Sequence, residues 1–85
     1  MTFQLDGEPL NAEYDEQEDI LYLWTGDEPQ DALTYETTDG HLVRLDPQTR
    51  EFVGVTILDY HARWAGAAEI RLQVPTLEER VLQPA

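Results

Sequence analysis

The sequence predicts a mainly β protein, an antiparallel up-and-down β-meander of four to five strands with a short helical or extended C-terminal segment. Runs rich in β-branched and aromatic residues alternate with short polar turns containing Gly, Asp or Pro, as in consecutive hairpins. Hydrophobic residues make up 41% of the 85 residues, enough for one small core and one domain over residues 1–85. A small α+β fold is the alternative, because the C-terminal third departs from the strand pattern.

Each predicted strand is a β-favouring run bounded by polar residues. The runs are residues 10–15, 20–24, 33–37, 42–45 and 52–58. The acidic turn at residues 16–19 joins the first two runs into a hairpin. A polar stretch with Gly26 and Pro29 separates that hairpin from the rest of the meander.

The register of the next hairpin follows from the faces of its strands, since a slip of one residue would swap those faces. The apolar side chains share one face when Tyr35 lies opposite Val43. The loop is then residues 38–40, and Gly40 takes its left-handed position.

The same argument places Leu45 opposite Val53 in the following hairpin, which leaves residues 48–50 as its loop. Arg50 then occupies the left-handed position. A non-glycine residue there costs roughly 1–2 kcal/mol relative to glycine.

Two faces of the sheet follow from these registers. The predicted core face carries Tyr14, Leu21, Leu23, Leu33, Tyr35, Val43, Leu45, Val53, Val55 and Ile57. The second face carries Ile20, Tyr22, Trp24, Leu42, Phe52 and Leu58. In a sheet with one solvated face, hydrophobic and polar residues alternate more regularly along each strand than they do here. We therefore expect either the C-terminal segment or another subunit to cover part of the second face.

The C-terminal third contains three local signals. Asp59 is placed to cap a short helix over residues 60–65. Residues 70–74 alternate as an amphipathic strand that Pro75 ends. Residues 76–79 fit a capping box, which leaves open whether a second short helix or an extended tail follows.

Part of the chain resembles a known family. The residues that carry the resemblance are Tyr14-Asp15, Ile20-Leu21-Tyr22-Leu23 and the run from Leu45 to Leu58. They resemble the small bacterial family catalogued as domain of unknown function 2283, over about residues 12–59 of this chain. Arg50 departs from the glycine that is usual in that turn, and residues 60–85 are an unusual extension. The resemblance implies a small antiparallel β fold with no established activity, cofactor or catalytic residue. Some relatives are suspected of acting as antitoxin-like partners of a small basic protein.

The charge of the chain is strongly asymmetric. Twelve carboxylates and no lysine or arginine precede Arg44, whereas the rest of the chain holds six carboxylates and five arginines. The net charge of −13 repels phosphates, so neither nucleic acid nor a membrane surface is an expected partner. Residues 1–6 do not read as a signal peptide and no apolar stretch has membrane-spanning length, so we expect a cytoplasmic protein.

Few residues are suited to catalysis or metal binding. Ser, Cys and Lys are absent, which removes the usual nucleophiles. A calcium loop that began at Asp15 would need glycine and glutamate where Ile20 and Gly26 stand. His41 and His61 lack metal-ligand spacing and are predicted to be surface or strand-end residues. We therefore expect no catalytic residue, cofactor or metal site; a carboxylate-based hydrolase is a distant alternative.

Tyr22 and Trp24 on the second face are the predicted centre of a partner interface, with Asp27, Glu28 and Asp31 as its acidic rim. The functional prediction is a non-catalytic protein-binding module, antitoxin-like in one form, that meets a basic protein. The alternative is a structural or homo-oligomeric domain with no separate ligand, of which a homodimer is one form. In either case Tyr22 and Trp24 are covered by a protein surface, unless the C-terminal segment covers them within the monomer.

Overall fold

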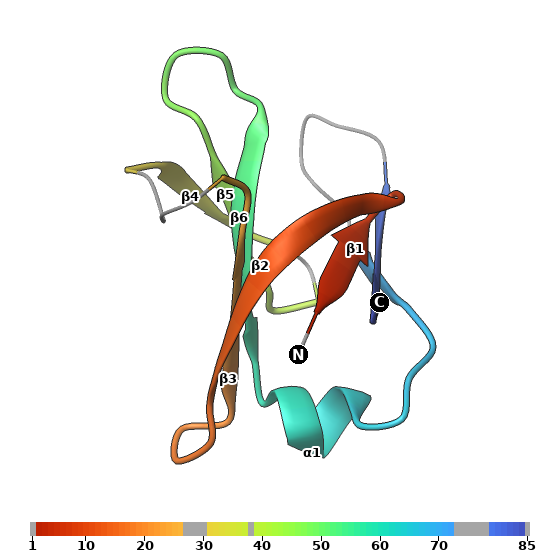
Figure 1. The fold of residues 1–85 in the computed structure, drawn as a ribbon. Helices are drawn as coiled ribbons and strands as arrows, with labels where there is room; N and C mark the ends of the chain where they lie inside the picture. Colours follow the sequence, from red (N-terminus) through yellow and green to blue (C-terminus); the bar gives the residue numbers. More distant parts are fainter. Residues whose placement is uncertain (1, 27–30, 38, 73–78, 85) are drawn as a thin grey trace.

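The computed structural model describes residues 2–26, 31–37, 39–72 and 79–84. These residues form one curled antiparallel sheet of eight strands, in the order β4-β5-β6-β3-β2-β1-β8-β7, and one short helix (Figure 1). The elements are β1 (Phe3–Leu5), β2 (Glu8–Asp15), β3 (Ile20–Trp24), β4 (Leu33–Glu36), β5 (Leu42–Leu45), β6 (Phe52–Leu58), α1 (Tyr60–Trp64), β7 (Ile70–Leu72) and β8 (Arg80–Pro84). The predicted mainly β, antiparallel class is confirmed, but the prediction of four to five strands is too low. The predicted up-and-down meander is also wrong, because β3 pairs with β6 instead of β4, and β1 pairs with β8.

Strand β2 makes the sheet curl. Residues 8–10 pair with β1, whereas residues 11–15 pair with β3. In Figure 1 this strand arches from the β3 hairpin to β1, so that the two halves of the sheet face each other. The core fills the space between them with Phe3, Leu5, Leu10, Leu21, Leu23, Val43, Leu45, Val55, Ile57, Ile70, Leu72 and Leu82.

The predicted register of the β4–β5 hairpin is confirmed. Tyr35 lies opposite Val43. The backbone N–H of Thr37 donates to the carbonyl of His41 (2.8 Å), and the backbone N–H of Gly40 donates to the carbonyl of Thr37 (3.0 Å). Residue 38 of the predicted loop lies outside the described residues. Gly40 has φ 84°, the left-handed position that the sequence predicts.

The β5–β6 hairpin differs from the prediction by a β-bulge. Leu45 lies opposite Phe52, not Val53, because the register shifts between Arg44 and Leu45. Phe52 therefore packs against the core instead of lying on the second face. Val53 is half-buried and does not join the core cluster.

The physical reason for that shift lies in the turn. The Asp46 carboxylate accepts hydrogen bonds from the backbone N–H groups of Gln48 (2.8 Å) and Thr49 (2.9 Å), which also lower its pKa. This side-chain turn makes the loop one residue longer than predicted, at residues 47–50. Arg50 nevertheless takes the left-handed conformation that the sequence predicts, with φ 65°.

Helix α1 is present where the sequence predicts it, but its cap comes from elsewhere. Asp59 has φ 53° and makes no side-chain capping bond. The carboxylate of Asp19, at the tip of the β2–β3 hairpin, accepts from the backbone N–H of His61 (2.7 Å) and of Ala62 (3.1 Å). The cap is thus supplied across the fold by the acidic turn.

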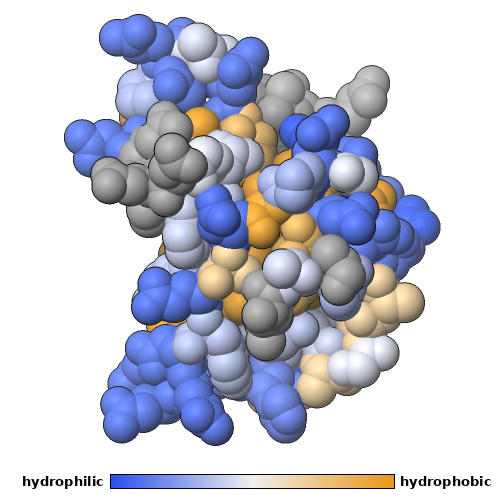
Figure 2. Space-filling model, in the orientation of Figure 1, coloured by the Kyte–Doolittle hydropathy of each residue, from blue (hydrophilic) through white to orange (hydrophobic). Residues whose placement is uncertain are grey.

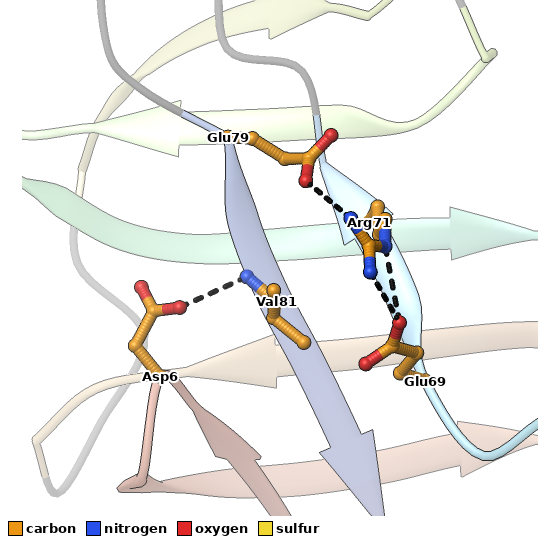
Figure 3. A network of polar contacts seen from close by, with 5 residues as sticks. All are labelled: Asp6, Glu69, Arg71, Glu79 and Val81. Atoms are coloured by element: carbon orange, nitrogen blue, oxygen red, sulfur yellow. Dashed lines mark hydrogen bonds and ion pairs between the residues drawn. The ribbon is translucent and has the colours of Figure 1, made fainter.

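The two ends of the chain are paired through β1 and β8, which the sequence analysis did not predict. The backbone N–H of Val81 donates to the Asp6 carboxylate at 3.0 Å (Figure 3), and Arg80 pairs with the same carboxylate. On the neighbouring strand β7, Arg71 lies between Glu69 and Glu79, at 3.0 Å from each (Figure 3). The strand predicted at residues 70–74 is confirmed for residues 70–72. Residues 73–78, with Pro75 and most of the predicted capping box, lie outside the described residues.

Strands β7 and β8 lie on the core side of the half of the sheet that β2, β3, β6 and β5 form. Ile70, Leu72 and Leu82 are buried in the same core cluster as Leu21 and Leu23 of β3 and Val55 and Ile57 of β6. The prediction that the C-terminal segment covers the second face is therefore wrong for the described strands β7 and β8. That segment instead supplies the second half of the core.

Candidate functional site

The face of β2, β3, β6 and β5 opposite the core is called the open face below. It follows from the alternation along each strand, since its residues alternate with buried ones. It carries Glu13, Asp15, Ile20, Tyr22, Trp24, Leu42, Arg44, Thr56 and Leu58. Tyr22, 39% exposed, is the large hydrophobic side chain that stands out as exposed among the described residues. For the molecule as a whole, in the orientation of Figure 1, hydrophilic residues dominate the surface in Figure 2 and hydrophobic ones gather between them.

Cross-strand rows order this face. In one row Glu13 lies opposite Tyr22, and Tyr22 lies opposite Thr56. In the next row Trp24 lies opposite Gly54, and Gly54 lies opposite Arg44. Since Gly54 has no side chain, none separates Trp24 from Arg44 in that row.

Gly54 also allows β3 and β6 to approach closely. A Cβ atom at Gly54 would lie 2.7 Å from the carbonyl oxygen of Leu23 and 3.6 Å from the Cβ of Trp24. No larger residue fits this position without moving the backbone. Gly54 thus fixes the place of Trp24 on the open face.

A hollow of ≈ 340 Å³ opens on this face. Its lining residues are Glu13, Asp15, Tyr22, Leu23, Trp24, Arg44 and Thr56. Carboxylates from β2 form one wall, the aromatic side chains of β3 lie in the middle, and a guanidinium from β5 stands on the other side. A hollow of this composition can receive a cationic group that has an apolar stem.

Hydrogen bonds leave much of the acidic wall available. One oxygen of Asp15 accepts from the backbone N–H groups of Gln17 (3.0 Å) and Glu18 (3.1 Å). The carboxylate of Glu13 has no hydrogen-bond or ion-pair partner within the described part of the chain. Glu13 is exposed, so its charge is carried into the solvent beside Tyr22.

The structure brings together part of the predicted interface. Tyr22 and Trp24 both line the hollow, as neighbours on β3. Asp27 and Glu28 lie outside the described residues. Asp31 is exposed before β4 and does not line the hollow.

Sequence reasoning missed Glu13, Asp15, Arg44 and Thr56 as lining residues. The first two could have been found, because the acidic turn sets Asp15 opposite Ile20 and hence Glu13 beside Tyr22. Arg44 reaches the hollow because β6 pairs with β3 and sets Gly54 between Trp24 and Arg44. The predicted meander did not include that pairing of β3 with β6.

A second polar cluster joins the buried His41 to residues of α1. His41 is fully buried, and neither ring nitrogen has a hydrogen-bond partner in the described structure. Its ring lies 5.5 Å from that of Trp64, and the guanidinium of Arg63 lies 5.3 Å over the Trp64 ring. Burial, with the charge of Arg63 as a smaller cause, lowers the pKa of His41 below its usual 6.5. The histidine stands at a strand end as predicted, but it is not on the surface.

Tyr14 and Asp19 form a hydrogen-bonded pair that stabilises the fold. The Tyr14 hydroxyl donates to Asp19 at 2.7 Å, which raises the pKa of Tyr14 to about 12 and lowers that of Asp19. The same carboxylate caps α1. Its hydrogen-bonding capacity is therefore engaged in holding the helix.

Comparisons with protein-family models, curated proteins and solved structures gave no match for this chain. The resemblance to domain of unknown function 2283 therefore stays a prediction. Across the described ranges, no group of three or more His, Asp or Glu side chains is placed to hold a metal ion. Helix α1, the helix that those ranges contain, is too short to span a membrane.

Proposed function

We propose that this protein is a non-catalytic binding module that docks a basic protein partner on its open face. The observation that carries the proposal is the hollow itself, where the exposed ring of Tyr22 lies next to carboxylates that β2 presents. Strands β7 and β8 contribute to the core on the other side of the sheet, so these two strands do not cover this surface.

The composition of the open face supports an interface. Apolar side chains of Ile20, Leu42 and Leu58 extend the aromatic centre, and each is half-buried. Carboxylates stand at its margins, with Glu13 on β2 and Glu36 on β4. An apolar centre with a charged rim is the usual anatomy of a protein–protein interface.

Charge supports a basic partner over a second copy of this chain. The net charge of −13 makes two copies repel each other. The same charge accelerates the encounter with a cationic protein, and salt weakens that attraction. Neutralisation of a small basic protein, as an antitoxin does, is one form that such a function takes.

Capture of partners at two salt concentrations tests the proposal. The tagged protein, the Tyr22→Ala variant and a Gln83→Ala control are used as baits at about 50 mM and about 500 mM salt. Gln83 is exposed on β8, away from the open face. We expect the native bait and the control to retain a lysine- and arginine-rich protein at low salt only, and Tyr22→Ala to lose it.

Two results would reject the proposal. One is retention of the basic protein by the Tyr22→Ala bait at the level of the control. The other is a molar mass of twice the chain for the purified protein by light scattering, with Tyr22→Ala monomeric. That second result would assign the open face to a homodimer.

A further inference from the structure

We infer that the hollow on the open face seats one arginine side chain of the partner, stacked on Tyr22 and paired with Glu13. This inference rests on the proposed function, because it names the group that the same face recognises. A seat for arginine differs from a general attraction to positive charge, since it requires a ring and a carboxylate at a fixed relative position.

The register supplies that relative position. Glu13 and Tyr22 are directly opposite on neighbouring antiparallel strands. Side chains in such a pair have Cβ atoms about 4.5–5.5 Å apart. A planar guanidinium can lie over the phenol ring and direct N–H groups at the adjacent carboxylate, whereas the compact ammonium of lysine does not combine both contacts as well.

The protein makes the same arrangement with one of its own arginines. The guanidinium of Arg80 lies 5.6 Å over the Phe52 ring and pairs with the Asp6 carboxylate. In that cluster β8 supplies the arginine, β6 the ring, and the turn after β1 the carboxylate. On the open face, Glu13 and Tyr22 supply the carboxylate and the ring, and the arginine is the component that a partner would add.

The size and polarity of the hollow agree with one side chain. A volume of ≈ 340 Å³ accommodates an arginine with its flanking backbone, but not a helix. Arg44 stands on the far wall, on β5. Three strand spacings, about 14 Å, separate the backbones of β2 and β5, so Glu13 and Arg44 belong to opposite sides of the hollow.

Titration of the isotopically labelled protein with three small probes tests the inference by NMR. The probes are N-acetyl-arginine amide, N-acetyl-lysine amide and N-acetyl-citrulline amide, which is uncharged but has nearly the shape of arginine. We expect saturable shifts at Tyr22 and Trp24 with the arginine probe, affinity about fivefold weaker for lysine, and no saturation with citrulline.

A pair of variants with the same charge change completes the design. Glu13→Gln should weaken the arginine probe about fivefold or more, whereas Glu16→Gln, at the exposed hairpin tip, should change it less than twofold. Equal affinity for arginine and lysine, equal effects of the two variants, or no saturable binding would each overturn the inference. If a basic protein were still captured through Tyr22 in any of these cases, the arginine seat would fail and the proposed function would stand.

Discussion

Replacement of Gly54 by alanine tests how the fold positions the open face. In most strands this change stabilises a protein by about 0.5–1 kcal/mol, because glycine loses more backbone freedom on folding. Here the new Cβ atom would lie 2.7 Å from the Leu23 carbonyl oxygen, where ordinary contacts begin at 3.4 Å. That oxygen belongs to the backbone, so no side-chain rotation relieves the overlap.

The clash is expected to outweigh the entropic gain. Forcing an extra methyl group into a filled position costs about 1–3 kcal/mol. After subtraction of the entropic gain, the net loss of unfolding free energy is up to about 2.5 kcal/mol, which corresponds to a fall in Tm of up to about 20 °C for a domain of this size. Differential scanning calorimetry measures the fall, and the indole N–H signal of Trp24 should shift because β3 and β6 move apart.

Gly7→Ala is the matched control. Gly7 has φ 88°, and no atom lies within 4 Å of the place that a Cβ atom would take, so that variant reports only the cost of a left-handed alanine. That cost is about 1 kcal/mol, with no change at the Trp24 indole. A Gly54→Ala protein as stable as the native protein, or more stable, would refute the close approach of the two strands.

Three further predictions concern the turns and the helix. Arg50→Gly should relieve the left-handed backbone but lose the hydrogen bond to the Tyr35 hydroxyl (3.0 Å), for a net gain of about 0.5 kcal/mol; a lower Tm would contradict this. Asp19→Asn should lower Tm and return the pKa of Tyr14 from about 12 towards 10.0, measured by absorbance titration, and an unchanged tyrosine titration would disprove the hydrogen bond. Because burial lowers the folded-state pKa of His41 below 6.5, the unfolded chain takes up the proton first, so stability should fall as pH drops below about 6.5, by at most about 1.4 kcal/mol per pH unit. Thermal unfolding of His41→Phe at several pH values should show a flatter dependence above pH 5, and an identical dependence would exclude His41 as the cause.

The hairpin register was predictable wherever a turn residue and a face pattern agreed. Gly40 satisfied both conditions, and its hairpin has the predicted pairing. In the β5–β6 hairpin the predicted pairing is wrong next to the loop, because the side-chain turn at Asp46 makes the loop one residue longer. A bulge then exchanged Phe52 for Val53 on the core face.

Contacts between distant parts of the chain were the least predictable. Asp6 and Arg80 pair across nearly the whole sequence, and neither lies in a motif that points to the other. The Asp19 cap of α1 is of the same kind, since local pattern favoured the adjacent Asp59. Such pairings depend on the curl of the sheet, which only the assembled fold sets.

The candidate site was predictable in its aromatic centre and not in its surroundings. Tyr22 and Trp24 follow from alternation along one strand. To place Glu13 beside Tyr22, one must know that β2 pairs with β3. To place Arg44 in the same hollow, one must know the pairing of four strands, β2, β3, β6 and β5. The residues of a site that spans several strands can therefore be predicted from the sequence only where the strand order and register are known.

The acidic half of the chain has more than one task. Asp6 and Asp19 bind backbone N–H groups that β8 and α1 present, so their charges stabilise the fold. Asp15 shapes the first hairpin turn through one of its oxygens. Glu13 has no such structural contact in the described residues and is the carboxylate that we assign to a partner.

Chemical-shift mapping with a hexa-arginine peptide tests the central claim most directly. The peptide is attracted to every carboxylate, so the position of the largest shifts is informative. Docking on the open face predicts that they occur in β3, at Tyr22 and the Trp24 indole. Largest shifts at the hairpin tip, around Glu16 and Glu18, would show attraction to the charge alone and would contradict a binding site on the open face.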